Sequence, residues 1–78
     1  MENDHPEIAM DVSGLLCPLP VLKARKRLNA MPPGAVLVVT ATDPMSAIDI
    51  PHFCNEQGHA LEQQSQTGTT FTFRIRRK

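Results

Sequence analysis

The sequence predicts a two-layer α/β (α+β) sandwich whose elements follow the order β-α-β-α-β-β, with two helices on one face of the sheet. Two segments, 8–13 and 70–76, alternate apolar and polar side chains as half-buried strands do. Two others, 18–31 and 44–57, carry the start and stop signals of helices and lie between strand-like segments. The 78 residues have room for one domain, and right-handed crossovers would place both helices on the same side of its sheet.

The N-terminal half is expected to form a tail, a strand and a helix. Residues 1–7 are polar and are expected to be a disordered tail, so that the domain spans 8–78. Gly14 ends the strand, and Pro33-Gly34 ends the helix. On an ideal helical wheel the expected core stripe comprises Val21, Ala24, Leu28 and Met31. The opposite side, an apolar and basic mixture that is unusual for a solvent face, carries Leu19, Leu22, Lys23 and Lys26.

A buried strand and a second helix are expected next. Residues 35–41 form a continuous run rich in β-branched residues, typical of a central strand that is covered on both faces or nearly so. Asp43-Pro44 has the form of an N-cap followed by a proline at the first helical position, and Gly58 is the expected stop. Pro51 lies inside this helix and removes one hydrogen bond, which predicts a kink or a restart of the helix there.

The last two strands are expected to pair as a hairpin. Residues 60–66 are a weak, polar strand, and Thr67-Gly68-Thr69 is a turn. In the final strand the apolar side chains occupy every second position, at Phe71, Phe73 and Ile75. This strand should therefore present one apolar face to the core.

Composition and charge exclude several classes of protein. The longest apolar runs are far shorter than the roughly 18 residues of a membrane span, and the acidic N-terminus has no apolar stretch of the kind found in signal peptides. We therefore expect a cytoplasmic protein without a membrane partner, and two cysteines are too few for a disulfide scaffold. The net charge is zero, but the bases fall in two clusters, which are Lys23, Arg25, Lys26, Arg27 and Arg74, Arg76, Arg77, Lys78.

The most informative stretch is Cys17-Pro18-Leu19-Pro20. A residue before proline favours extended geometry, so Cys17 is predicted as the N-cap, with Pro18 at the first helical position. The free amides of Leu19 and Val21, with the positive end of the helix, would then favour the thiolate. The sequence predicts a rigid, exposed and activated cysteine; the alternative is a buried, small apolar residue that happens to precede a helix.

The chemistry open to Cys17 is narrowed by what surrounds it in the sequence. No second cysteine follows at the Cys-x-x-Cys spacing, which argues against a dithiol oxidoreductase. A cysteine protease needs a general base, and nothing in the sequence places His52 or His59 beside the thiol. An activated cysteine without a resolving partner fits the carriage of a reversible adduct, and a persulfide is the obvious one.

An ordered set of motifs across about residues 8–77 resembles the TusA/SirA-like sulfur carriers. The set comprises Cys17-Pro18-Leu19-Pro20, Pro33-Gly34, Asp43-Pro44, Asp49-Ile50-Pro51-x-Phe53-Cys54 and Gly58-His59. The resemblance implies a four-stranded mixed sheet of order 1-2-4-3 whose last strand is antiparallel. It also implies that Cys17 takes sulfane sulfur from a donor persulfide, such as that of a cysteine desulfurase or rhodanese, and passes it to an acceptor protein. Acceptor pathways in the family include tRNA thiolation, molybdenum cofactor maturation and sulfur metabolism.

The resemblance describes a sulfurtransferase-type carrier that works only with partner enzymes. We expect no cofactor, and we expect a monomer because one exposed sulfur must meet successive partners. Pro18, Leu19, Pro20 and Val21 would support the motif. The predicted docking surface for partner proteins comprises Leu22, Lys23, Arg25, Lys26, Asp43 and Pro44; a solvated helix face is the alternative.

The remaining candidates have structural explanations. Cys54 shares a helix face with Ile50 and Phe53 and is predicted to be buried, while a disulfide between Cys17 and Cys54 stays open without positive support. The C-terminal bases could contact RNA, so a non-catalytic regulatory or RNA-binding module is the alternative function. The absence of Trp and Tyr argues against base stacking and direct nucleic-acid binding. The histidines and cysteines lack zinc-ligand spacing, so no metal site is predicted.

Overall fold

A computed structural model describes residues 6–78, so the predicted tail at 1–5 lies outside the described residues. The elements along the chain are β1 (Glu7–Asp11), α1 (Leu19–Asn29), β2 (Val36–Ala41), α2 (Ser46–Gln57), β3 (Ala60–Thr67) and β4 (Thr70–Arg76). This order confirms the predicted β-α-β-α-β-β arrangement. β1 begins at Glu7, inside the segment expected as tail, because Glu7 pairs with Val36 of β2.

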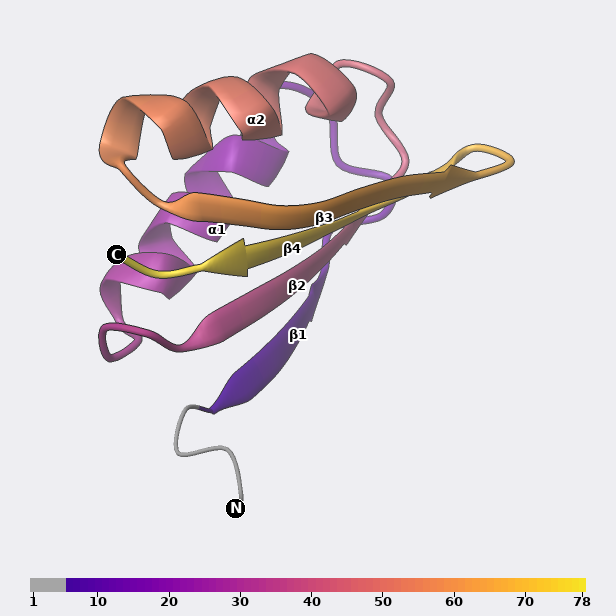
Figure 1. Cartoon of the computed structure of the whole chain (residues 1–78). Coiled ribbons are helices and arrows are strands. Elements are labelled where there is room, and N and C mark those ends of the chain that lie inside the picture. The colour runs from indigo at the N-terminus through magenta and orange to yellow at the C-terminus, as the bar shows by residue number, and fades with distance from the viewer. Residues whose placement is uncertain (1–5) are drawn as a thin grey trace.

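The described strands form one mixed sheet in the order β1-β2-β4-β3, as the family resemblance implied. β1 runs parallel to β2, whereas β4 is antiparallel to both β2 and β3. Both helices lie on the same face of this sheet (Figure 1). β3 and β4 are joined by a tight turn in which Gly68 has a φ of 60°, a left-handed conformation that glycine adopts without steric cost.

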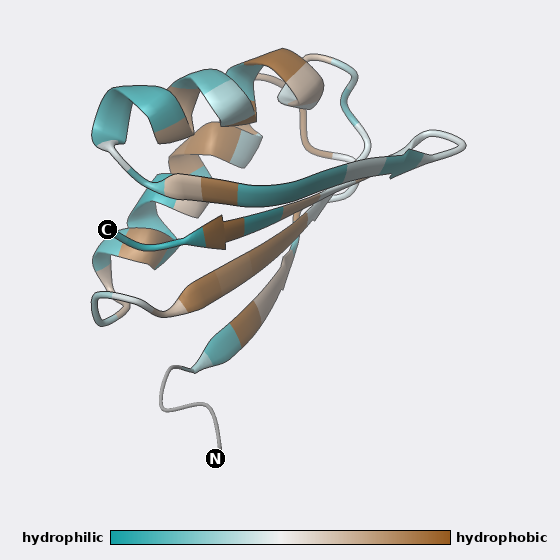
Figure 2. Cartoon of the chain, in the orientation of Figure 1, coloured by the Kyte–Doolittle hydropathy of each residue, from teal (hydrophilic) through white to brown (hydrophobic). Residues whose placement is uncertain are grey.

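The hydrophobic core fills the space between the helices and the sheet. The largest fully buried side chains include Phe73 of β4, Leu28 of α1 and Ile50 of α2. In the predicted stripe of α1, Ala24, Leu28 and Met31 are buried, and Val21 is half-buried against the same cluster. Coloured by hydropathy, β2 is largely hydrophobic and β3 largely hydrophilic (Figure 2), which agrees with the prediction of a buried central strand and a weak polar one.

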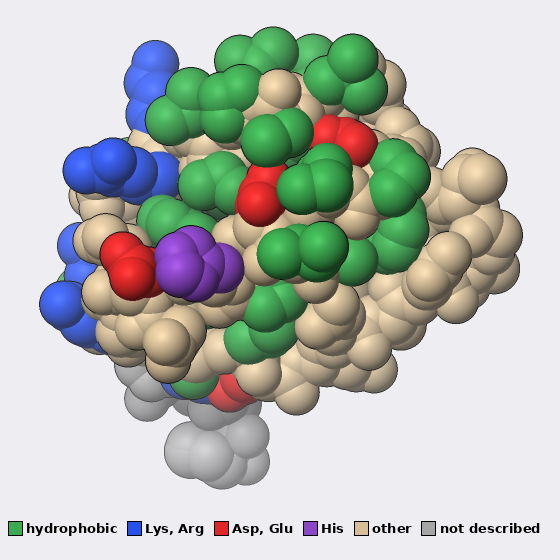
Figure 3. All heavy atoms as spheres, turned by 90° about the horizontal axis from the view of Figure 1, so that it is seen from above, with side chains coloured by type: hydrophobic (Ala, Val, Ile, Leu, Met, Phe, Trp, Pro, Cys, Tyr) green, Lys and Arg blue, Asp and Glu red, His purple; other side chains and the backbone are tan. Residues whose placement is uncertain are grey.

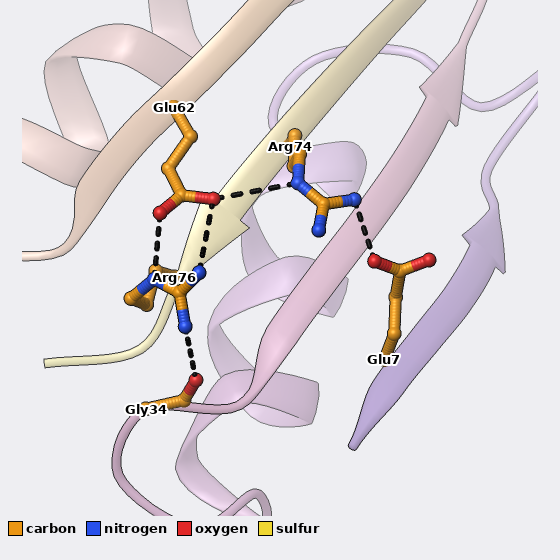
Figure 4. A network of polar contacts seen from close by, with 5 residues as sticks. All are labelled: Glu7, Gly34, Glu62, Arg74 and Arg76. Atoms are coloured by element: carbon orange, nitrogen blue, oxygen red, sulfur yellow. Dashed lines mark hydrogen bonds and ion pairs between the residues drawn. The ribbon is translucent and has the colours of Figure 1, made fainter. Parts of the chain in front are cut away.

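β2 is fully covered on one face and partly covered on the other, which fits the prediction of a central strand that is covered on both faces or nearly so. Leu37, Val39 and Ala41 face the helices and are fully buried, but Val38 and Thr40 on the other face are only half-buried. Both helices pack on one side, so the second face of the sheet carries polar side chains instead. Figure 4 shows the ion pairs that cross the strands on this face.

Glu62 and Arg74 lie at the centre of these ion pairs. Arg74 Nη1 lies 2.6 Å from Glu7 Oε2, and Arg74 Nε lies 3.3 Å from Glu62 Oε1. The Nε of Arg76 donates to Glu62 Oε2 over 2.6 Å, and its Nη1 donates to the carbonyl oxygen of Gly34 over 2.8 Å. The bond from Arg76, together with the charge of Arg74, lowers the pKa of Glu62.

α2 differs from its prediction at its start and at Pro51. The helix begins at Ser46, because the N–H groups of Ser46 and Ala47 donate three residues back, to Asp43 and Pro44, in a preceding turn. α2 then continues through Pro51, so of the two predicted alternatives, a kink or a restart, the restart is wrong. Proline leaves the Ala47 carbonyl without its usual donor, and Gln64 Nε2 of β3 donates to that oxygen over 3.4 Å. Gly58, with a φ of 79°, ends the helix as predicted.

Candidate functional site: the Cys17 loop

Cys17 lies in the loop between β1 and α1, and its side chain is exposed. The peptide bond between Cys17 and Pro18 is cis. The N–H of Leu19 donates to the carbonyl oxygen of Leu16 over 2.8 Å, which closes a turn of the kind that holds a cis-proline at its third position. The first helical bond follows, from the N–H of Leu22 to the carbonyl oxygen of Pro18 over 3.1 Å.

This turn shifts the start of α1, so the prediction that Cys17 is the N-cap is wrong. Pro18 is the N-cap, with a φ of −98° and a ψ of 13°, and Pro20 lies in the first turn. Cys17 is therefore one residue outside the helix. The Leu19 amide is used by the Leu16 carbonyl and is not a free donor for the sulfur, contrary to expectation. Pro20 packs in the interior, where its fully buried ring anchors the start of the helix.

Asp43 fixes the backbone of the Cys17 loop. Its Oδ2 accepts a hydrogen bond of 2.6 Å from the N–H of Cys17, and its Oδ1 accepts one of 3.2 Å from the N–H of Met45. A second hydrogen bond between the same two segments runs from the N–H of Gly14 to Oγ1 of Thr42 over 2.8 Å. β1 and β2 are parallel, so the segments that leave them meet at the same edge of the sheet. This topology brings Asp43 beside a cysteine that is distant in sequence.

Asp49 contacts the sulfur itself. The thiol of Cys17 donates to Oδ2 of Asp49 over 2.9 Å. This hydrogen bond, partial desolvation and the charges of Asp49 and Asp43 raise the pKa of the Cys17 thiol. The predicted activation of the free thiol is therefore wrong, because the charges that act on it are the carboxylates of Asp49 and Asp43, which disfavour the thiolate.

Asp49 belongs to one of the sequence motifs, Asp49-Ile50-Pro51-x-Phe53-Cys54, but the motif alone indicates no role for its side chain. A signal was available in the helical spacing of α2. Asp49, Phe53 and Glu56 are separated by four and three residues and so share one side of the helix. In the structure these residues line a groove between α2 and the start of α1, together with Cys17, Pro18, Val21, His52 and Gln57.

Exposed apolar side chains surround this site. Figure 3 views the molecule from the helix side and shows hydrophobic side chains gathered around acidic ones. The large hydrophobic residues that are most exposed are Leu16 at 67%, Ile48 at 63%, Leu22 at 49%, Met45 at 45% and Leu19 at 44%. Exposure of this kind on a small domain is typical of a surface that meets other proteins. The predicted exposure of Leu19 and Leu22 is confirmed.

The predicted docking residues fall into three groups in the structure: exposed residues, exposed residues that line a second groove, and one buried residue. Leu22, Arg25 and Pro44 are exposed. Lys23 and Lys26 are also exposed, and they line a second groove with Arg27, Ala30 and Met10 that does not include Cys17. Asp43 is only 8% exposed, and its carboxylate is engaged by the Cys17 and Met45 amides. Asp43 thus shapes the loop from inside rather than presenting a charge on the surface.

Cys54 is 2% exposed, which confirms the predicted burial, and this burial raises its pKa to about 11. Cys17 and Cys54 are both free thiols. His59 follows the C-cap of α2, and its ring is tilted by 44° against that of Phe53, with the ring centroids 5.7 Å apart. Burial and the charges of Arg77 and Lys78 lower the pKa of His59. Within residues 6–78, no group of three or more His, Cys, Asp or Glu side chains could hold a metal ion.

The C-terminal basic cluster is engaged within the chain. Besides the pairs of Arg74 and Arg76, Arg77 Nε donates to the carbonyl oxygen of Leu28 over 2.8 Å. These arginines brace β4 against β1, β3 and the end of α1. The three arginines of this cluster therefore hold specific partners within the domain. The part of the chain that the structure describes has no helix long and apolar enough to cross a membrane.

The fold and the site define a small two-layer α/β domain that presents an exposed cysteine on the loop before its first helix. Residues 8–77 match the family described as Sulfurtransferase TusA, and the chain belongs to this family. It is 42% identical over 78 residues to the Sulfur carrier protein TusA of Pseudomonas putida strain GB-1, covering 100% of this chain and 98% of that protein. It is 47% identical over 68 residues to the protein of the same name from Allochromatium vinosum, covering 87% and 90%.

A solved structure shows the same fold. The crystal structure of a SirA-like protein from Desulfitobacterium hafniense superposes with a TM-score of 0.78, covering 88% of this chain and 95% of that one. The two sequences are 24% identical, so this similarity speaks for the architecture alone. It agrees with the predicted two-layer arrangement.

Proposed function

We propose that this chain is a sulfur carrier in which Cys17 accepts sulfane sulfur as a persulfide and relays it to an acceptor protein. The observation that carries the proposal is the exposed thiol of Cys17, held on a braced loop in a chain of the TusA family. Its relatives from Pseudomonas putida and Allochromatium vinosum bear the name sulfur carrier protein. The site offers a thiol and a shallow groove, which suits carriage better than catalysis on a small substrate.

The transfer step is an exchange between sulfur atoms. The Cys17 thiolate attacks the outer sulfur of a donor persulfide, a new S–S bond forms at Cys17, and the S–S bond of the donor breaks. The donor leaves as a thiolate and takes up the proton that Cys17 lost, so the step needs no external oxidant or reductant. In the second step an acceptor thiolate attacks the outer sulfur of the Cys17 persulfide, a new S–S bond forms on the acceptor, and the S–S bond at Cys17 breaks. Cys17 leaves as a thiolate and takes up the proton that the acceptor thiol lost.

Partner proteins supply the remaining geometry. We propose a donor of the cysteine desulfurase or rhodanese kind in the cytoplasm, and an acceptor in tRNA thiolation, molybdenum cofactor maturation or sulfur metabolism. The docking surface would combine the exposed apolar residues around Cys17 with the exposed members of the predicted set, which are Leu22, Lys23, Arg25, Lys26 and Pro44. A large apolar area with basic groups at its margin is suited to binding a protein surface. A monomer leaves this area free for successive partners.

Intact-protein mass spectrometry tests the proposal. After incubation with a cysteine desulfurase and cysteine, the wild-type chain should gain one sulfur, about 32 Da. Cys17→Ser should gain nothing, whereas Cys54→Ala, which removes the buried thiol, should still gain one sulfur. Failure of the wild-type chain to gain mass from a desulfurase, a rhodanese persulfide or a polysulfide would count against the carrier role.

A further inference from the structure

Asp49 is the polar group that meets the Cys17 sulfur. Its Oδ2 accepts the thiol hydrogen bond over 2.9 Å. Asp49 is half-buried in the first turn of α2, and its own N–H donates to the carbonyl oxygen of Met45 over 2.8 Å. A carboxylate is favoured at this end of a helix because it faces the positive end of the helix dipole. The acceptor of the thiol hydrogen bond is therefore held by the backbone of a regular helix.

Most of the charged side chains around the sulfur are acidic. α2 contributes Asp49, His52 and Glu56 to the groove, and the segment before α2 contributes Asp43. His52 Nε2 lies 3.8 Å from Glu56 Oε2, and both of these side chains are largely exposed. The start of α1 contributes only the uncharged Pro18 and Val21. A thiolate formed here would face carboxylates without a cation from α1, whereas a thiol finds an acceptor.

We propose that Asp49 is a positioning residue that holds Cys17 in the thiol form while the carrier is free, and that a cationic side chain of a docked partner releases it. The inference deepens the proposed function and rests on it. Exposed thiolates react with oxidants and with unrelated electrophiles, whereas thiols are much less reactive. A carrier that binds several partners in turn benefits from a thiol that reacts slowly with other molecules while the carrier is free in solution.

The release step follows from the same contact. A partner lysine or arginine that pairs with Asp49 would compete with the hydrogen bond from Cys17 and place a positive charge beside the sulfur. Both effects favour the thiolate. The proton lost from Cys17 then passes to the thiolate that leaves the donor, so the transfer balances as written above. The thiolate would thus form in the docked complex, at the time when the donor persulfide is present.

The test measures alkylation of Cys17 by iodoacetamide across the pH range in which thiols titrate, with modification quantified on the Cys17 peptide by mass spectrometry. Asp49→Asn removes the charge with little change of shape, and Glu56→Gln is the matched control in the same groove. We expect the midpoint of the rate profile to move to lower pH in Asp49→Asn, with a several-fold higher rate at neutral pH. A lower pKa makes each thiolate somewhat less nucleophilic, but it increases the fraction of Cys17 present as thiolate at neutral pH by more, so the alkylation rate rises.

The control variant Glu56→Gln should keep the wild-type rate profile. Asp49→Glu retains the charge, so its midpoint should lie close to that of the wild type. An unchanged or higher midpoint in Asp49→Asn would overturn the proposal. If Asp49→Asn does not fold, the wild-type midpoint in buffer is compared with that in urea, where the contact is absent; a native midpoint at or below the unfolded one also overturns it. Iodoacetamide needs no sulfur donor, so failure of this inference and failure of sulfur carriage are observed separately.

Discussion

The N–H of Cys17 donates a hydrogen bond of 2.6 Å to Oδ2 of Asp43, a residue 26 positions further along the chain. The same carboxylate receives the N–H of Met45 at the start of α2. One buried side chain therefore couples the loop that carries the sulfur to the segment that precedes the second helix. The position of Cys17 depends on this long-range contact as well as on the two prolines of its own loop.

Replacement of Asp43 by alanine should destabilise the domain. It leaves two amides of the loop region without their acceptor, and the loss of hydrogen bonds to a buried charged group costs about 2–3 kcal/mol. Urea denaturation followed by circular dichroism measures the free energy of unfolding. Asp11→Ala is the matched control, since Asp11 Oδ1 also accepts a backbone N–H, that of Ser13 over 2.9 Å, but at an exposed site. Equal losses in the two variants would refute the anchoring role of Asp43.

Charge reversal at Arg25 and Lys26 to glutamate should slow sulfur transfer from the donor without unfolding the domain. Both side chains are exposed, and surface substitutions usually change stability by less than about 0.5 kcal/mol. Repulsion at the docking surface should lower the second-order transfer rate about tenfold at low salt, and added salt should reduce the difference.

The control for this prediction separates docking from net charge. Two double variants are compared, and each changes the net charge by −2. The first combines Arg25→Gln with Lys26→Gln on α1. The second combines Gln63→Glu with Ser65→Glu on β3, away from α1. Only the first pair should slow the transfer. Identical kinetics in the two double variants would show that the basic residues of α1 do not take part in docking.

Burial of Cys54 should make the domain less stable at high pH. Its thiol has a reference pKa of 9.0 and a folded pKa of about 11. A group whose pKa is raised by folding stabilises the native state below the unfolded pKa, and this contribution is lost as the pH rises through the folded pKa. The free energy of unfolding should fall by about 3 kcal/mol between these limits.

Cys17→Ser is the background for this measurement, because it leaves Cys54 as the thiol that titrates. Urea denaturation at several pH values yields the slope, and Cys54→Ala in the same background should flatten it. A slope that persists in Cys54→Ala would assign the alkaline loss of stability to other groups.

Local sequence patterns were sufficient for most of the fold. The alternation of Phe71, Phe73 and Ile75 placed the last strand, and the spacing of Ala24 and Leu28 placed the buried face of α1. These signals succeed because the period of an element and the side it buries are set by neighbours in sequence. The helix starts were predicted less well. Hydrogen bonds of the turns at Leu16–Leu19 and at Asp43 moved both helices to later residues, and turn chemistry of this kind competes with simple capping rules.

The amino-acid sequence by itself determined the order of the elements and the exposed leucines of α1, and it is the basis for proposing Cys17 as the reactive residue, because each depends on periodicity or on a short motif. Only the tertiary structure decided what surrounds the sulfur. The parallel pairing of β1 and β2 brings Asp43 to the Cys17 amide, and the packing of α2 against α1 brings Asp49 to the thiol. Electrostatic effects depend on distance in space, and the structure places the carboxylate of Asp49, rather than a free helix amide, against the sulfur.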